Sequence, residues 1–241
     1  MNRSTTALTA AVSLLLSIDP PLLVGLTPAV VIGLDLSSIQ VAHAQMAENS
    51  LNSGNRNHER GDNKGAIADL SKAADINTEN ADAFFKRGIN KWISEDFQGA
   101  IDDYSVVIEI NPQHGDAYRN RGLNKGLLGN HPGAIADFTK AIEINPQDIL
   151  AYLWRGSNRE KVDDLKGAIA DYTKVIEIDP KFSPAYANRG RSKKNMGDLE
   201  SACADWKKMA DLEGNDVADY DEIQCWHVAR SDFNACFKLG P

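Results

Sequence analysis

The sequence lacks the residue patterns by which enzymes and metal centres are recognised. Its five histidines include no pair with metal-ligand spacing. It has no P-loop, no glycine-rich dinucleotide motif after a strand and no G-x-S-x-G nucleophile motif. Cys225 and His227 are close in the chain, but such near neighbours on a helix do not face each other. We therefore expect no catalytic residues, no cofactor and no metal, and an enzyme is the least favoured class of function.

Positive charge is also in deficit. The chain has 26 Lys and Arg residues against 34 Asp and Glu residues, which gives a formal net charge of −8. Binding to nucleic acid requires clustered basic side chains that neutralise phosphates, and no basic block is present. The sequence therefore argues against a nucleic-acid partner.

The first 44 residues differ in character from the rest. Arg3 precedes an apolar run at 7–18, and the small residues of 41–44 follow later in an A-x-A arrangement. This order is typical of a secretory signal peptide, and we expect cleavage after Ala44. The chain has no Arg-Arg pair for twin-arginine export and no cysteine before Cys203 for a lipid anchor.

An uncleaved membrane anchor is the alternative for this segment. Only fifteen residues separate Asp19 from Asp35, and three of them are proline, whereas a spanning helix needs roughly twenty apolar residues. We favour a signal peptide at 1–44, so that the membrane is a partner only if the segment stays uncleaved. The mature chain is then exported to a periplasm, a photosynthetic lumen or the extracellular medium.

The chain does contain a regular period. Five glycines recur every thirty-four residues, an alanine follows each glycine by twelve residues, and a large apolar residue follows the alanine by four. These columns are Gly54, Gly88, Gly122, Gly156 and Gly190; Ala66, Ala100, Ala134, Ala168 and Ala202; Leu70, Tyr104, Phe138, Tyr172 and Trp206. A fixed period of this length indicates a solenoid, in which one supersecondary unit is copied and stacked.

Each unit is predicted to be two helices joined by a turn. Ala134, Phe138, Ala141 and Ile142 recur at steps of three and four, which draws one apolar stripe on a helix. Prolines at 112, 146 and 180 end the second helices, because the residue before a proline is disfavoured in helical geometry. A glycine inside a helix costs about 1 kcal/mol against alanine, so we expect the glycine column to allow close helix packing.

This pattern resembles the tetratricopeptide repeat. Units counted as 47–80, 81–114, 115–148, 149–182 and 183–216 put glycine at position 8, alanine at position 20 and, in the three central units, proline at position 32. The segments AYRNRG at 117–122 and GAIADFTKAIEINP at 133–146 are similar to bacterial repeats of this family, including secreted ones. The resemblance implies an all-α, right-handed superhelix of five helix-turn-helix repeats, followed by a capping helix and tail at 217–241.

The three cysteines, Cys203, Cys225 and Cys236, all follow residue 202. A pair is expected to bridge in an oxidising compartment. Cys203 lies at position 21, which holds isoleucine in the other four units and is expected to be core. An antiparallel hairpin of helices 199–212 and 215–226 brings Cys203 and Cys225 to one level, as in related secreted repeats. We favour this disulfide; a Cys225–Cys236 link and three free thiols are the alternatives.

Arginine and aspartate also recur with the period. Arginine stands at position 7 of units two to five, and aspartate stands at position 23 of all five units. The columns are Arg87, Arg121, Arg155 and Arg189; Asp69, Asp103, Asp137, Asp171 and Asp205. We interpret them as partly buried ion pairs, with the arginine stems packed on aromatic rings, rather than as a ligand site.

The family resemblance also predicts the functional surface. Stacked helix pairs curve so that first helices line an inner groove, and positions 2, 5, 6, 9 and 12–13 are expected to project into it. The predicted groove residues are Phe85, Lys86, Ile89, Trp92, Arg119, Asn120, Leu123, Trp154, Asn188 and Arg191. Lys86 stands where the clamp for chaperone C-terminal carboxylates has asparagine, so that clamp is not matched.

These observations predict an exported scaffold that binds a protein or an extended peptide in its groove, with a role in complex assembly. The alternative is a structural or self-associating envelope-associated repeat protein that has no dedicated peptide ligand.

Overall fold

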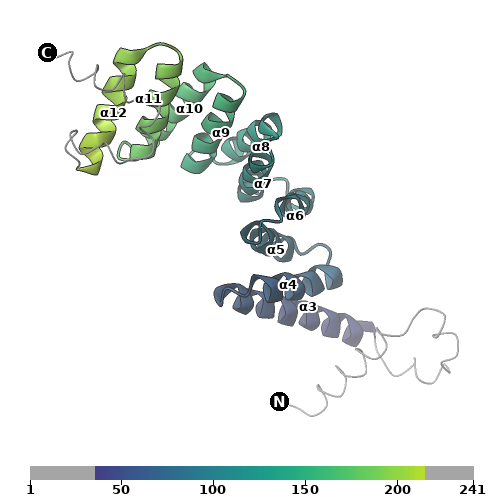
Figure 1. Cartoon of the computed structure of the whole chain (residues 1–241). Coiled ribbons are helices and arrows are strands. Elements are labelled where there is room, and N and C mark those ends of the chain that lie inside the picture. The colour runs from purple at the N-terminus through teal and green to yellow at the C-terminus, as the bar shows by residue number, and fades with distance from the viewer. Residues whose placement is uncertain (1–35, 215–241) are drawn as a thin grey trace, which may run out of the picture. The chain divides into compact units, whose positions relative to one another are not determined.

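The computed structural model describes residues 36–214 and forms only helices within this range (Figure 1). The helices are α3 Leu36–Glu59, α4 Asn63–Ile76, α5 Ala81–Ile93, α6 Phe97–Ile110, α7 Gly115–Leu127, α8 His131–Ile144, α9 Ile149–Lys161, α10 Leu165–Ile178, α11 Ser183–Asn195 and α12 Leu199–Glu213. The predicted all-α fold of successive helix pairs is confirmed. The expected capping helix and tail at 217–241, and residues 1–35 of the expected signal peptide, lie outside the described residues.

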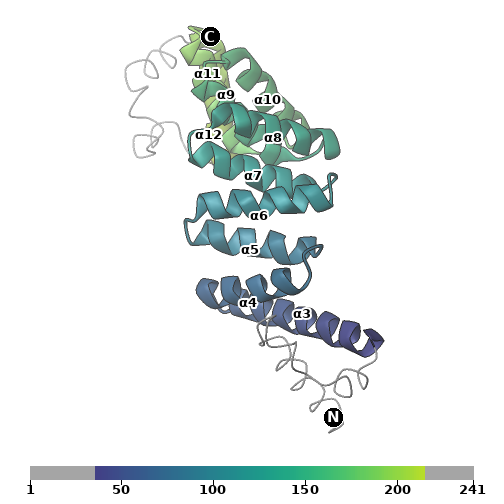
Figure 2. The same ribbon diagram turned by 90° about the vertical axis from the view of Figure 1, so that its right-hand side faces the viewer.

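The chain divides into two compact units, whose described parts are 36–96 and 97–214. In the first unit, α3 and α4 lie side by side in both views (Figures 1 and 2), and α4 packs on α5. In the second unit, the pairs α7–α8, α9–α10 and α11–α12 form hairpins, and each second helix packs on the next first helix. We call α3, α5, α7, α9 and α11 first helices, and the others second helices.

Turn residues set the helix boundaries. Position 15 has a positive φ in every unit, at Gly61, Glu95, Gly129, Asp163 and Gly197. The next residue caps α4, α8, α10 and α12: Asp62, Asn130, Asp164 and Asp198 each accept a hydrogen bond from the backbone N–H three residues later. At the other end of α8, Asn145 is extended (φ −127°, ψ 94°), as expected before proline.

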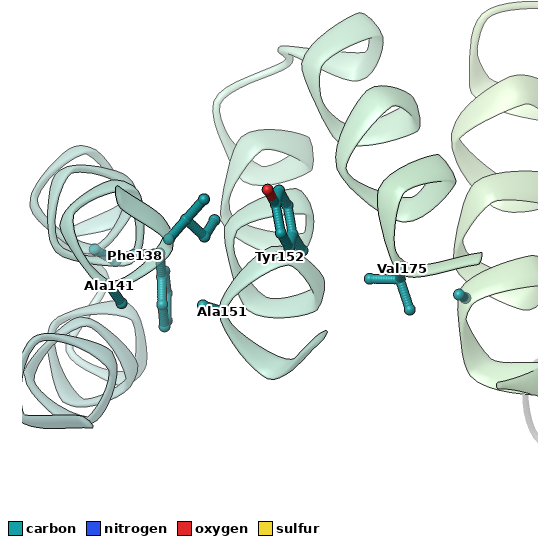
Figure 3. Packing of buried hydrophobic residues seen from close by; sticks show 8 residues of the cluster. Phe138, Ala141, Ala151, Tyr152 and Val175 are labelled. Atoms are coloured by element: carbon teal, nitrogen blue, oxygen red, sulfur yellow. The ribbon is translucent and has the colours of Figure 1, made fainter. Parts of the chain in front are cut away.

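The glycine column lets the two helices of a repeat approach closely. A Cβ atom on Gly156 of α9 would lie 2.7 Å from Cε1 of Tyr172 on α10, and Tyr172 is fully buried. One on Gly122 would lie 3.2–3.3 Å from atoms of Ala134, Asp137 and Phe138 on α8. The close packing predicted for these glycines is therefore confirmed. Beside them, Phe138, Ala141, Ala151, Tyr152 and Val175 belong to one apolar cluster that joins successive repeats (Figure 3).

The arginine column ties the first helices α7, α9 and α11 each to both neighbouring second helices. Arg155 of α9 donates to both carboxylate oxygens of Asp171 on α10, at 3.0 and 2.6 Å. Its remaining amino group donates to the hydroxyl of Thr139 on α8, and its guanidinium carbon lies 5.5 Å from the ring centre of Tyr152. Arg121 and Arg189 make the same set of contacts. The interpretation of these columns as structural ion pairs is confirmed.

Two details of the aspartate column go beyond that interpretation. In the first repeat, which has Ser53 in place of arginine, Asp69 accepts from Lys72, Ser53 and Asn57 instead. Hydrogen bonds from Lys72 and Ser53 hold the pKa of Asp69 below its ordinary value. In the third repeat, the hydrogen bond to Asp137 raises the pKa of Arg121. The aspartate column thus stays paired even where its arginine is missing.

One expectation about the core is wrong. The position-21 residues Ile67, Ile101, Ile135 and Ile169 are only half-buried, and so is Cys203 on α12. Positions 20 and 24 face the partner helices, and position 21 is turned about 100° away from position 20 on a helix with 3.6 residues per turn, at the margin of the buried stripe. Cys225 and Cys236 lie outside the described residues, so the Cys203–Cys225 disulfide stays a prediction.

The expected cleavage point after Ala44 falls inside α3, which has 24 residues against 13 in each other first helix. Val41 is 69% exposed, and the first buried residue of α3 in the described side chains is Ala47. Within the described range, no helix is long and apolar enough to cross a membrane.

The glycine column generates the first prediction. Gly156→Ala should lower the free energy of unfolding by about 1–3 kcal/mol, because the new methyl group overpacks the buried Tyr172 ring. Urea unfolding followed by circular dichroism measures this change. Gly115→Ala is the control, since its Cβ has one contact under 3.4 Å, with a methyl group of Ile144. Equal stability of the two variants would show that the glycine column does not set the helix spacing.

The ion-pair column generates the second prediction. Asp171→Asn should lower the free energy of unfolding by about 3 kcal/mol, because two arginines, Arg155 and Arg159, lose their common buried anion. Glu177→Gln breaks the exposed Lys174–Glu177 pair and should change stability by less than about 1 kcal/mol. Thermal unfolding at neutral pH compares the two. A loss no larger in Asp171→Asn than in Glu177→Gln would contradict a structural role for the column.

Candidate functional site

The first helices carry exposed apolar side chains that the core does not use. In the second unit, Leu127 at the end of α7 is 53% exposed, and Leu150 and Trp154 of α9 are 46% and 39% exposed. By contrast, the exposed sides of α8 and α10 carry the ion pairs Lys140–Glu143 and Lys174–Glu177. Exposed apolar residues that gather on one surface mark candidate sites of interaction. We call the exposed side of α7, α9 and α11 the first-helix surface.

A pocket of about 310 Å³ lies between the first helices of the first unit. Asn55, His58 and Glu59 line it from α3, and Lys86, Ile89 and Asn90 line it from α5. In repeat numbering these are positions 9, 12 and 13 of one repeat and positions 6, 9 and 10 of the next. The structure thus brings the predicted groove residues Lys86 and Ile89 together at one pocket.

The pocket has a defined polar lining. The Asn90 side-chain nitrogen donates to the carbonyl of Lys86 at 2.8 Å, which leaves its Oδ1 atom facing His58. His58 Nδ1 therefore donates to this oxygen, at 3.0 Å, and its Nε2 atom is the remaining ring position. Lys86 pairs with Asp82 at 2.8 Å. The imidazole and the opposite charges of Glu59 and Lys86, with Ile89 as apolar wall, can receive a polar segment of another chain.

Position 10 is a buried polar column that the sequence analysis missed. Asn90, Asn124, Asn158 and Ser192 each bond to the backbone carbonyl four residues earlier. Three of them also bond to a side chain of the preceding repeat: Asn90 to His58, Asn158 to His131 and Ser192 to Glu160. Three asparagines and a serine at a thirty-four-residue spacing were a readable signal. These side chains are buried beneath the surface between successive first helices.

The other predicted groove residues differ in what they offer. Phe85, Asn120, Leu123 and Asn188 are half-buried, and Leu123 packs on the apolar core. Arg119 is 25% exposed and pairs with Asp116 and Asp148, both at 2.7 Å. Trp92 is 41% exposed in the first unit, and Trp154 and Arg191 are exposed in the second. Arg191 is 48% exposed and pairs with Glu160 at 2.7 Å.

Comparisons with known proteins agree with this architecture. A family model described as "TPR repeat" matches 54–89, and models described as "Tetratricopeptide repeat" match 115–148, 149–182 and 171–204. Together these matches cover more than half of the chain. A comparison with curated proteins finds no match.

Solved structures show the same fold. A crystal structure of MamA protein superposes with a TM-score of 0.69 at 23% identity, covering 75% of this chain and 98% of that one. MamA from Desulfovibrio magneticus RS-1 gives 0.68 at 21% identity, covering 70% and 96%. YrrB, described as "a TPR protein with an unusual peptide-binding site", gives 0.66 at 21% identity, covering 75% and 90%.

The helix pairs, the glycine and alanine columns and the family matches have one explanation. The chain belongs to the tetratricopeptide repeat family, whose fold serves protein–protein interaction in general.

Proposed function

We propose that this protein is an exported scaffold that binds an extended segment of a partner protein on the first-helix surface and acts in the assembly of a complex. The observation that carries the proposal is the exposure of Trp154 in the middle helix α9, with Leu150 exposed on the same helix and Leu127 exposed on α7. Tryptophan is among the residues that most often dominate binding energy at protein interfaces. The membership of the family supports protein binding as the general activity.

The surroundings of Trp154 suit an extended peptide. Asn120 and Asn188 hold the same repeat position on α7 and α11, the helices on either side of α9. Each side-chain amide carries a donor group and an acceptor group, which matches the backbone of an extended chain. The unpaired backbone of such a segment needs partners of this kind once it is removed from water.

Self-association without a peptide ligand is favoured by a different observation. Leu128, Val162 and Met196 hold position 14 in three consecutive repeats of the second unit and are 51%, 43% and 45% exposed. They lie at the turns between first and second helices, outside the first-helix surface. Sedimentation of the purified chain measures its oligomeric state. Oligomers that are lost in Val162→Ser would favour this second function.

Export is the part of the proposal that rests on residues 1–44 alone. Cleavage after Ala44 would remove most of the extension by which α3 exceeds the other first helices, and would leave the buried Ala47 in place. The mature chain would then consist of repeats from its first residues onward. A periplasm, a photosynthetic lumen and the extracellular medium all remain compatible with this signal.

The third prediction tests the binding surface. Peptides are selected from a random displayed library on the purified chain, and their affinities are measured by fluorescence anisotropy. Trp154→Ala should weaken the selected peptides by about ten-fold or more, because a desolvated aromatic anchor is lost, while circular dichroism stays unchanged. Met196→Ala, which truncates another exposed apolar residue, should bind normally. Normal binding by a folded Trp154→Ala chain would exclude the first-helix surface as the site.

The fourth prediction tests export. N-terminal sequencing of the protein isolated from its native cells should read Gln45 as the first residue, because Ala42 and Ala44 fit the recognition pattern of signal peptidase. Ala44→Arg should block this cleavage and leave the longer chain in the membrane fraction. A native protein that starts upstream of Leu22 would instead support the uncleaved anchor.

A further inference from the structure

We call the surface strip where two neighbouring first helices meet a seam. Within the second unit, the side chains that line one seam differ in chemistry from those that line the next. We propose that the first-helix surface selects segments in which a large apolar side chain and an acidic side chain lie about three residues apart. The inference rests on the proposed function, because it names the partner segment that the same surface takes.

The seam between α3 and α5 shows which positions face a ligand. Its pocket is lined by positions 9, 12 and 13 of one repeat and by positions 6, 9 and 10 of the next. The same pairs of first helices adjoin in the second unit, at α7–α9 and at α9–α11. Because the repeats share their thirty-four-residue length and each pair of first helices is in contact, these six positions define the equivalent seams there.

The α7–α9 seam is apolar. Leu123 and Leu127 hold positions 9 and 13 on α7, and Trp154 holds position 6 on α9. Leu127 and Trp154 are exposed, and the remaining positions are the small Gly126 and Ser157 and the buried Asn158. No charged side chain stands at any of the six positions. An apolar side chain of a bound segment fits this seam.

Gly126 makes this seam less polar than the α3–α5 seam, because it has no side chain where that seam has a histidine. It occupies the position of His58, and a Cβ atom there would lie 2.8 Å from Oδ1 of Asn158. The histidine that bonds to Asn158 is instead His131, which reaches it from the start of α8 at 2.9 Å. The buried amide is thus satisfied by a histidine of α8, and position 12 of the first helix carries no polar side chain.

The α9–α11 seam is charged with a positive excess. Glu160 on α9 is only 12% exposed and accepts from both Ser192 and Arg191 of α11, so its charge is already compensated. Lys161 at position 13 is exposed, so the six positions carry two cations, Lys161 and Arg191, against one anion. Two acids follow Lys161 in the turn: Asp163 is exposed, and Asp164 caps α10 and contacts Arg159. The complement of this seam is an acidic side chain.

The two seams are one repeat apart, which sets the spacing on the ligand. Packed helix axes lie roughly 10 Å apart, and an extended chain advances about 3.3 Å per residue. A segment crossing α9 therefore covers the distance between the seams in about three residues. An apolar residue over Leu127 and Trp154 then places an acidic residue, three positions away, beside Lys161 and Arg191.

The test uses labelled nine-residue peptides on a Gly/Ser background and the purified full chain. Each peptide carries one leucine and one aspartate, separated by two, three, four or six positions, in both orders. We expect the tightest binding at a separation of about three in one order. Replacing leucine with serine should weaken binding about ten-fold, and replacing aspartate with lysine should weaken it about five-fold.

Charge reversal on the protein locates the acidic contact. Lys161→Glu should reverse the preference, so that the lysine peptide binds better than the aspartate peptide. Lys166→Glu makes the same change of net charge at an exposed lysine of α10, and should leave the preference as it is. Equal effects of the two substitutions would show a general charge effect and overturn the assignment of the acidic residue to the α9–α11 seam.

The outcomes separate this inference from the proposed function. If library-selected peptides depend on Trp154 but are indifferent to Lys161→Glu and to the Leu–Asp spacing, the surface binds peptides and the inferred selectivity is wrong. If no peptide depends on Trp154, the proposed function itself fails. Tight binding of peptides with both residues at any spacing would also overturn the two-seam geometry.

Discussion

The arginine at position 7 is the contact on which the arrangement of the repeats depends. In each of three successive repeats it pairs with an aspartate of its own second helix and with a hydroxyl group of the preceding one. A buried charge without its partner is strongly destabilising, so a first helix cannot rotate without breaking two contacts. Arg155 points inward, and its neighbour Trp154 is turned about 100° away. The ion pair that fixes the core thus also fixes which residues face the partner.

The sequence predicted the roles of those residues that recur at the same position in all or nearly all repeats. The glycine, alanine and arginine–aspartate columns each have one role in helix packing, and in the structure they lie at the helix contacts that this role requires. Position 21 was misjudged because an isoleucine at the edge of an apolar stripe is as hydrophobic as the residues at its centre. The position-10 asparagines were overlooked although they recur with the same period. The partner of Arg119, Asp148, lies 29 residues away, and such a non-repeating contact cannot be deduced from spacing.

The position-10 column explains how one backbone yields unlike subsites. The buried amide or hydroxyl must be hydrogen-bonded, but its partner comes from position 12 in two seams and from position 17 in another: His58, Glu160 and His131. Each solution leaves a different group, or none, between neighbouring first helices. The chemistry of a seam can therefore change while the helix packing stays the same. This is the physical basis for an apolar seam next to a charged one.

The spacing between the seams is held by residues outside them. Asp148 caps α9 by accepting from the N–H of Ala151, and its other oxygen pairs with Arg119 of α7. This bridge and the apolar cluster around Phe138 join α7 and α9 without using the exposed part of Trp154 or Leu127. Because structural and exposed side chains occupy separate positions, substitutions on the first-helix surface report on recognition, and substitutions at the ion pairs report on the fold.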